Sequence, residues 1–214
     1  MLTILVPIVV LLAVVPLFLH RDRVGRALAL RRAGLGWMGL YTFTFGAFVI
    51  GDTADDPGGW AALLLTASWM LPLVALSWLA WSRPQRALPV LGVLLAAAVG
   101  YPAGAASGWD AFRALQSFEG PVDAIALFVV CVALAVLGWH RPLPAALLLL
   151  VSAILPMVFH MLGSGAPPSA ALGGSLAAAT APEALTGLLY LLSVLFEGRP
   201  TAHPAPPKAS PATV

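Results

Sequence analysis

Long apolar stretches, separated by short polar segments, follow one another along most of the chain. A helix needs about 20 apolar residues to cross the roughly 30 Å hydrocarbon core of a bilayer, so each long stretch predicts a membrane-spanning helix. Six stretches qualify: 2–19, 35–51, 60–81, 88–106, 121–139 and 143–162. They are too long for barrel strands and do not alternate apolar with polar residues, so the pattern predicts an all-α helix bundle that crosses the membrane several times.

A seventh span is predicted where the apolar sequence ends, with two alternative lengths. The shorter version, 182–196, begins at Pro182 and Glu183, because proline fits the first turn of a helix and the helix dipole favours a carboxylate there. The longer version, 170–196, could cross a bilayer but contains both residues. The last helix is therefore expected to be short or kinked at Pro182. Residues 199–214 are rich in proline and predict a disordered cytoplasmic tail after a transmembrane domain of residues 1–198.

Composition agrees with this pattern. Apolar residues make up 60% of the chain and charged residues 9%, whereas soluble domains have about 45–50% and about 25%. Ten arginines to one lysine, and no asparagine, are typical of a GC-rich genome, so we expect a multi-pass protein of a bacterial plasma membrane. The net charge of +2 gives no reason to expect a nucleic-acid partner.

The basic residues predict the orientation, because arginine and lysine are enriched in short cytoplasmic loops. Of the eleven basic residues, only Arg113 falls on the opposite side from the rest. The other ten are Arg21, Arg23, Arg26, Arg31, Arg32, Arg83, Arg86, Arg141, Arg199 and Lys208. We therefore expect an outside N-terminus and a cytoplasmic C-terminus, as seven spans require. The first five arginines are interpreted as residues that determine this orientation. The alternative is that they bind anionic lipid headgroups, with a binding free energy of about 1 kcal/mol for each arginine.

Three Arg-Pro pairs stand 58 residues apart and suggest an internal repeat. The pairs are Arg83-Pro84, Arg141-Pro142 and Arg199-Pro200, and the ten-residue segments ending in the first two are identical at six positions. Each pair follows an odd-numbered span, where arginine suits the cytoplasm and proline a sharp entry into the next helix. The equal spacing favours duplication of a helical hairpin, with the copies parallel in the membrane.

Candidate chemistry is sparse, because we expect no ionisable group at a bilayer centre. Asp123, His160 and Glu183 are predicted near the outer ends of the last three spans, where together they could bind a divalent metal or relay protons. The alternative is structural: Asp123 and Glu183 each follow a proline in a first helical turn, and His160 can lie among headgroups. No motif indicates a cofactor. The single cysteine, Cys131, is expected to be a buried small apolar residue.

Three functions remain open at this level. The short loops and the lack of intramembrane charge favour a non-catalytic membrane component, which is a subunit, a scaffold or a lipid-interacting protein with a membrane-protein partner. A transporter of an ion or small molecule is the alternative. A lipid-modifying enzyme would depend on Asp123, His160 and Glu183 as its acid-base groups. We also expect Gly34, Gly36, Gly39 and Gly46 to allow close helix contacts.

Overall fold

The structure is a computed structural model that describes residues 22–55, 59–106, 122–164 and 175–197. These residues form six α-helices and no strands, which confirms the all-α prediction for this part of the chain. The helices are α2 (Arg23–Asp55), α3 (Gly59–Ser82), α4 (Pro84–Ala106), α6 (Val122–His140), α7 (Pro142–Ser164) and α9 (Ser175–Glu197). The expected span 2–19 and the tail 199–214, with Arg199 and Pro200, lie outside the described residues.

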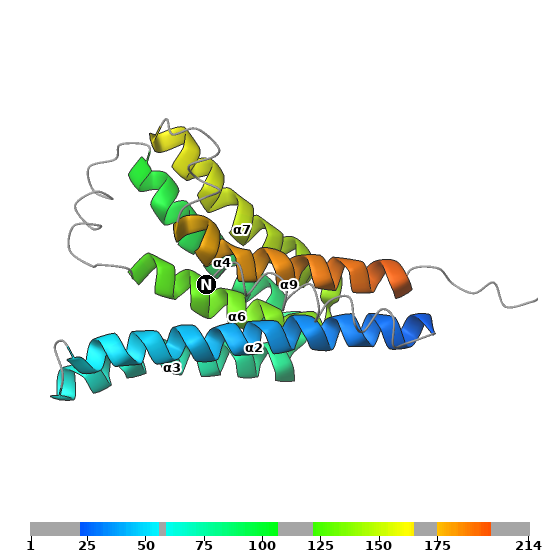
Figure 1. Ribbon diagram of the computed structural model, residues 1–214, viewed down its shortest axis with the longest axis horizontal. Helices are drawn as coiled ribbons and strands as arrows, with labels where there is room; N and C mark the ends of the chain where they lie inside the picture. The colour runs from blue at the N-terminus through cyan, green and yellow to red at the C-terminus, as the bar shows by residue number, and fades with distance from the viewer. Residues whose placement is uncertain (1–21, 56–58, 107–121, 165–174, 198–214) are drawn as a thin grey trace, which may run out of the picture.

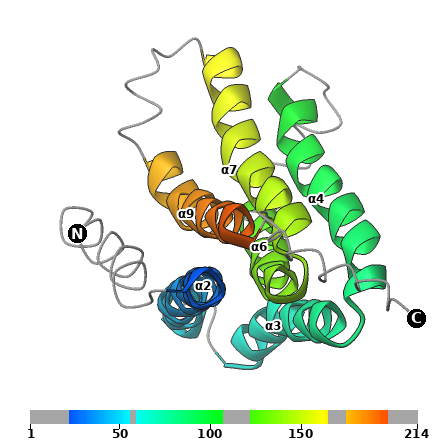
Figure 2. The same cartoon turned by 90° about the vertical axis from the view of Figure 1, so that its right-hand side faces the viewer.

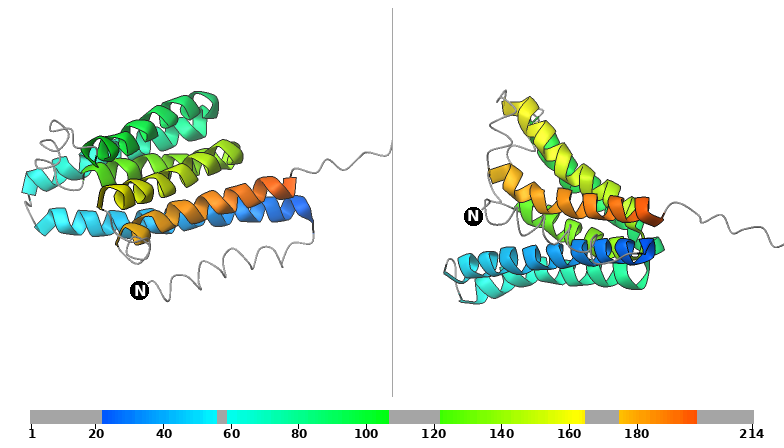
Figure 3. Two further views of the ribbon diagram at one scale, coloured as in Figure 1. Left: turned by 90° about the horizontal axis from the view of Figure 1, so that it is seen from above. Right: turned by 45° about the vertical axis from the view of Figure 1, so that its right-hand side comes forward.

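The six helices alternate in direction, so their first and last turns gather at two opposite ends of the bundle (Figure 1). Seen from one end, α6 lies in the middle, and α2, α3, α4, α7 and α9 surround it (Figure 2). Its residues from Phe128 to Ala135 are all buried. From above, α9 lies alongside α2 over much of its length (Figure 3). Helix α6 is therefore the core of the bundle, although nothing in its sequence distinguishes it from the other apolar stretches.

The described helices carry many large apolar side chains on the outside, and a few polar side chains are buried within the apolar core. Three of them, over Val24–Gly51, Gly59–Ser82 and Pro142–Phe159, are long and apolar enough to cross a membrane. Large apolar side chains are exposed along α3, including Trp60, Leu64 and Leu71, whereas Thr186 and Ser193 of α9 are fully buried. A protein in water would expose an extended apolar surface at high cost, so the exposed apolar side chains indicate a surface covered by lipid.

Helix α2 is longer than the sequence predicted. The expected span was 35–51, preceded by an arginine-rich loop, but the helix begins at Arg23 and includes the arginines at 26, 31 and 32. Asp22 caps it, because its carboxylate accepts a hydrogen bond of 2.9 Å from the backbone N–H of Gly25. Ala27 and Leu30 are fully buried between the arginines. An apolar residue every third or fourth position, together with the cap, extends the helix through a segment whose charge alone suggested a loop.

The two described Arg-Pro pairs form the same turn. Arg83 and Arg141 are the single non-helical residues between α3 and α4 and between α6 and α7. The N–H of each arginine donates to the carbonyl four residues earlier, at Leu79 and at Leu137, over 2.9 Å in both cases. The carbonyl of each arginine accepts from the N–H four residues later, at Ala87 over 3.0 Å and at Ala145 over 3.3 Å. These bonds stand 58 residues apart, like the sequence pairs.

The residues that follow the two turns are also buried at equivalent positions. Ala87 and Leu91 in α4 are fully buried, as are their counterparts Ala145 and Leu149 in α7. Equivalent positions therefore carry the same backbone bonds and the same burial, which supports duplication of the α3–α4 and α6–α7 hairpins. The similarity extends beyond the arginine and proline that a membrane interface would select by itself.

Candidate functional site

The candidate site lies on the face of α9 that points into the bundle. Polar side chains recur there every three or four residues, which places them on one side of a helix. They are Thr180, Glu183, Thr186, Tyr190, Ser193 and Glu197, and we call this set the polar stripe. All except Glu197 are buried, whereas Leu188, Leu192 and Leu195 on the opposite side are exposed. At 1.5 Å per residue the stripe is about 26 Å long, close to the thickness of a hydrocarbon core.

Glu183 is the buried acidic residue of the polar stripe. Its side chain is 4% exposed, and it lies beside the thiol of Cys131 in α6 and the hydroxyl of Ser152 in α7. Both neighbours stand about halfway along their helices. Tyr41 of α2 lies close enough to interact electrostatically with Glu183 and Cys131. Four helices therefore contribute to one buried polar group.

The depth of Glu183 differs from the sequence expectation. Helix α9 begins at Ser175, so Pro182 and Glu183 lie inside it and not in its first turn. The helix continues through Pro182, and the Thr186 hydroxyl donates to the Pro182 carbonyl over 2.8 Å. Glu183 therefore lies further inside α9 than the sequence suggested, beside residues about halfway along α6 and α7. Packing against α7 and α2 outweighs the tendency of proline to start a helix.

The two hydrogen-bond donors beside Glu183, on Cys131 and Ser152, also donate to other acceptors. The Ser152 hydroxyl donates to the Leu149 carbonyl over 2.8 Å, and the Cys131 thiol lies 3.4 Å from the Ser152 oxygen. Within the described residues, Oε2 of Glu183 has no hydrogen-bond partner. A buried carboxyl oxygen without a partner is costly in an apolar bundle, so this group calls for a functional explanation.

Tyr190 holds α9 against α6 and α2 further along the polar stripe. Its hydroxyl donates to the Ala135 carbonyl over 2.6 Å. A Cβ at Gly138 of α6 would overlap the Tyr190 ring, and one at Gly34 of α2 would lie 3.1 Å from the ring atom Cε1. The expected close contact at Gly34 is confirmed. It is not found at Gly36 or Gly39, where a Cβ would have no neighbour within 4 Å.

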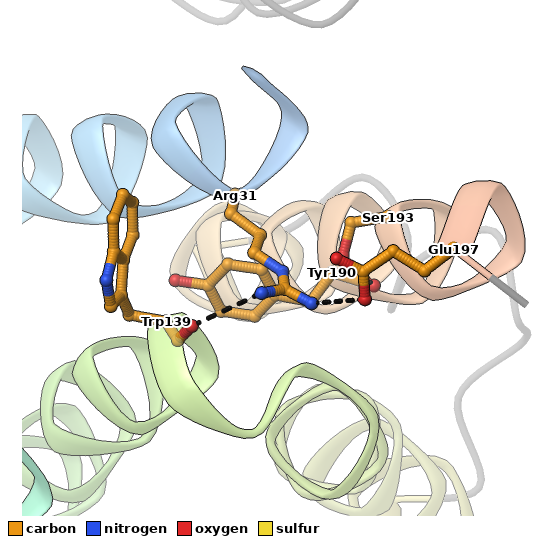
Figure 4. Close-up of polar contacts among 5 residues, drawn as sticks. All are labelled: Arg31, Trp139, Tyr190, Ser193 and Glu197. Carbon is orange, nitrogen blue, oxygen red and sulfur yellow. Dashed lines mark hydrogen bonds and ion pairs between the residues drawn. The ribbon is translucent and has the colours of Figure 1, made fainter. Parts of the chain in front are cut away.

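An ion pair closes the polar stripe at the arginine-rich end of the bundle. Arg31 extends from α2 toward α6 and α9, and its guanidinium pairs with Glu197 (Figure 4). The same group donates to the Trp139 carbonyl over 3.5 Å. Trp139 lies in the last turn of α6, where carbonyls lack helical donors and the helix dipole favours a cation. One arginine thus joins three helices.

The other predicted site residues are only partly described. The helices contain the backbones of Asp123 and His160, but these two side chains lie outside the described set, and their convergence with Glu183 stays a prediction. Among the described residues, no group of three or more histidine, cysteine, aspartate or glutamate side chains could hold a metal ion. Cys131 is buried, as predicted.

Sequence reasoning missed the polar stripe as a whole. The spacing of the six residues contains the signal. Length and hydropathy, however, treat each apolar stretch as a whole and reveal only its single charged residues, not a row of polar residues on one face. A search for polar residues at helical spacing within the last stretch would have found it. Comparisons of the chain with family models, with curated proteins and with solved structures find no match.

Proposed function

We propose that this chain is a seven-span integral protein of a bacterial plasma membrane, with its C-terminus in the cytoplasm. The alternation of the helices supports this proposal, because it places the arginines of α2 and of both Arg-Pro turns at the same end of the bundle (Figure 1). Arg32, Arg83 and Arg141 are exposed there, where the cytoplasmic leaflet carries anionic lipids.

Within this topology we propose that the protein transports an ion or a small solute across the membrane. The observation that carries the proposal is the buried carboxyl of Glu183, with one oxygen unpartnered in the described part of the chain. Ionisable groups inside a membrane bundle are rare and mark ion pathways by default, because their burial costs several kcal/mol. The polar stripe supplies oxygens along the bundle on both sides of this carboxyl.

The test is ion flux in proteoliposomes that contain the full chain. Vesicles loaded with a pH-sensitive, a Na⁺-sensitive or a K⁺-sensitive dye report the flux of each ion under an imposed gradient. We expect flux above that of empty vesicles for at least one ion. Glu183→Gln should lower this flux at least about tenfold, because an amide can neither take up and release a proton nor carry the negative charge that attracts a cation.

The matched control is Leu188→Ala, since Leu188 lies on the exposed side of the same helix. Its flux should equal that of the unchanged protein. If the unchanged protein carries none of the three ions, or if Glu183→Gln carries them equally well, transport through this group is refuted.

A non-catalytic membrane component is the second candidate, and one observation favours it. The hydroxyls of Thr186, Tyr190 and Ser193 each donate to a backbone carbonyl. The first and last of these bonds lie within α9, and the Tyr190 bond crosses to α6, where it serves simply to hold the two helices together. In this case the exposed arginines at the cytoplasmic end would bind anionic lipid. Replacing both Arg32 and Arg86 by glutamine would then reduce the amount of anionic lipid that co-purifies with the protein. The unchanged protein would show no ion flux in this case.

A further inference from the structure

We propose that the ion bound at Glu183 is a proton, so that this carboxyl is neutral when the bundle is closed as described. The inference rests on the proposed transport function and names the ion for the same site. Protonation forms one O–H bond on the carboxyl group, the proton coming from hydronium, which leaves as water. The charge of Glu183 changes from −1 to zero, and release reverses both changes.

No cation faces Glu183 from the described residues of the helices packed against it. The titratable groups that face it are Tyr41 from α2 and Cys131 from α6, both acids that are neutral in their protonated form. Helix α7 contributes the uncharged Ser152. The guanidinium of Arg31 lies ten residues before Tyr41, about 15 Å along α2, and is paired with Glu197. A carboxylate here would be a buried charge without a counter-ion.

The pattern of donors and acceptors also favours the neutral form. A carboxylate needs donors, and the Cys131 thiol and the Ser152 hydroxyl lie within reach of Glu183. Each has a single proton, however, and each also donates to another acceptor, the Ser152 oxygen and the Leu149 carbonyl. The Thr186 hydroxyl donates to the Pro182 carbonyl. A carboxylic acid needs an acceptor, and acceptors are in surplus. Each of these hydroxyl oxygens keeps a free acceptor site, and Pro156 has no N–H to donate to the Ser152 carbonyl four residues earlier.

A metal cation fits this group less well than a proton does. Hard cations require a cage of several oxygens, and transporters build such cages from the carbonyls of broken helices. Helices α6, α7 and α9 run unbroken past Glu183. The neighbours Cys131, Ser152 and Thr186 are at most 1% exposed, so they are tightly packed, and one of them is a thiol. A proton needs neither a cage nor additional volume.

Infrared spectroscopy of the full chain in lipid nanodiscs tests the inference directly. We expect the C=O stretch of a protonated carboxyl, which shifts in D₂O and disappears as the pH is raised. This band should be absent from Glu183→Gln and present in the matched control Glu197→Gln, whose carboxyl is partly exposed. Addition of Na⁺ or K⁺ at constant pH should leave the band unchanged.

A second measurement needs no variant and therefore does not depend on folding of Glu183→Gln. Dicyclohexylcarbodiimide adds to protonated carboxyls in apolar surroundings, and peptide mass spectrometry locates the adduct. We expect modification of Glu183 and not of Glu197, falling about tenfold for each pH unit once most of the carboxyl is ionised.

The outcomes separate the two proposals. If Glu183 gives no protonated band and no adduct at any pH, the bound ion is not a proton, even where vesicles show cation flux. If Na⁺ or K⁺ removes the band, the metal cation displaces the proton, and the proposal that the proton is the ion of this site is overturned. If the band titrates while vesicles show no flux of any ion, the proton site stands and the transport function falls.

Discussion

Gly138 and Tyr190 are the residue pair on which the approach of α9 to α6 depends. The ring of Tyr190 occupies the place where any other residue at 138 would carry its Cβ. Lipid offers no hydrophobic gain for joining helices, so close packing and hydrogen bonds must hold them together. The absence of a side chain at 138 thus allows the Tyr190 hydroxyl to reach the Ala135 carbonyl.

Replacing Gly138 with alanine should therefore destabilise the bundle. The new methyl group forces the Tyr190 ring to move, and overpacking of this kind costs about 1–3 kcal/mol. The measurement is the thermal unfolding temperature in detergent. Gly39→Ala is the control, because a Cβ at 39 has open space around it. Equal unfolding temperatures for the two variants would contradict the packing described for Tyr190.

At the residue level, the sequence predicted which residues are buried better than it predicted which residues contact each other. Cys131 was expected to be buried and Gly34 to lie at a helix contact, because residue type alone carries that information. The meeting of Glu183 with Cys131 and Ser152 could not be predicted. It depends on how three helices are rotated and shifted relative to one another, and neither quantity is encoded in residues close together in the sequence.

At the level of elements, α2 and α9 are joined at one end by Arg31 and further along by Gly34 and Tyr190. Glu197 lies at the C-terminal end of α9, where the helix dipole disfavours a negative charge. Arg31 offsets that charge and also binds the end of α6. Its Nε atom has no partner among the described residues, so the group is oriented by two of its donors.

Arg31→Gln should lower the free energy of unfolding by about 1–2 kcal/mol, because it removes both interactions of the guanidinium. Arg32→Gln should change it by less than about 0.5 kcal/mol, since Arg32 is exposed. Chemical denaturation in mixed micelles measures both. A double-mutant cycle with Glu197→Gln should give a coupling below about 1 kcal/mol, because Glu197 is 42% exposed. An equal effect of the two arginine variants would contradict the three-helix contact.

The two hairpins that contain the Arg-Pro turns lead to a paired prediction. Ala87→Leu and Ala145→Leu each place a large side chain at a fully buried position directly after an Arg-Pro turn. Both should destabilise the protein by about 1–3 kcal/mol and by similar amounts. Gln85→Leu serves as the control, because the equivalent position in the second hairpin already carries the exposed Leu143. A large effect of one alanine variant and none of the other would argue against structural equivalence of the copies.

For the molecule as a whole, the helices α3, α6 and α7 begin and end within two residues of the apolar stretches read from the sequence. Length and hydropathy determine such boundaries because a bilayer has a fixed thickness. The arrangement around α6 was not predictable in this way. Membrane helices expose apolar residues to lipid and bury them as well, so hydropathy does not reveal which helix is central.

Labelling with a membrane-impermeant maleimide tests the proposed topology in intact cells. In a Cys131→Ala background, Asp55→Cys stands at the end of α2 and Gln85→Cys directly after the first Arg-Pro turn. We expect Asp55→Cys to react from outside, and Gln85→Cys to react only after the cells are opened. The opposite result would reverse the orientation, and reaction of both in intact cells would exclude a membrane-crossing α3.

The polar stripe on the buried face of α9 has a consequence for insertion of this helix into the membrane. A buried glutamate and a proline make this segment a poor substrate for the translocon when it is judged alone, since a charged residue at a helix centre costs about 2.5–3.5 kcal/mol on insertion. Its partners α2, α6 and α7 precede it in the chain and leave the ribosome first. Stable insertion of α9 would then depend on the helices that are already in the bilayer. Deleting those helices should therefore leave α9 outside the membrane.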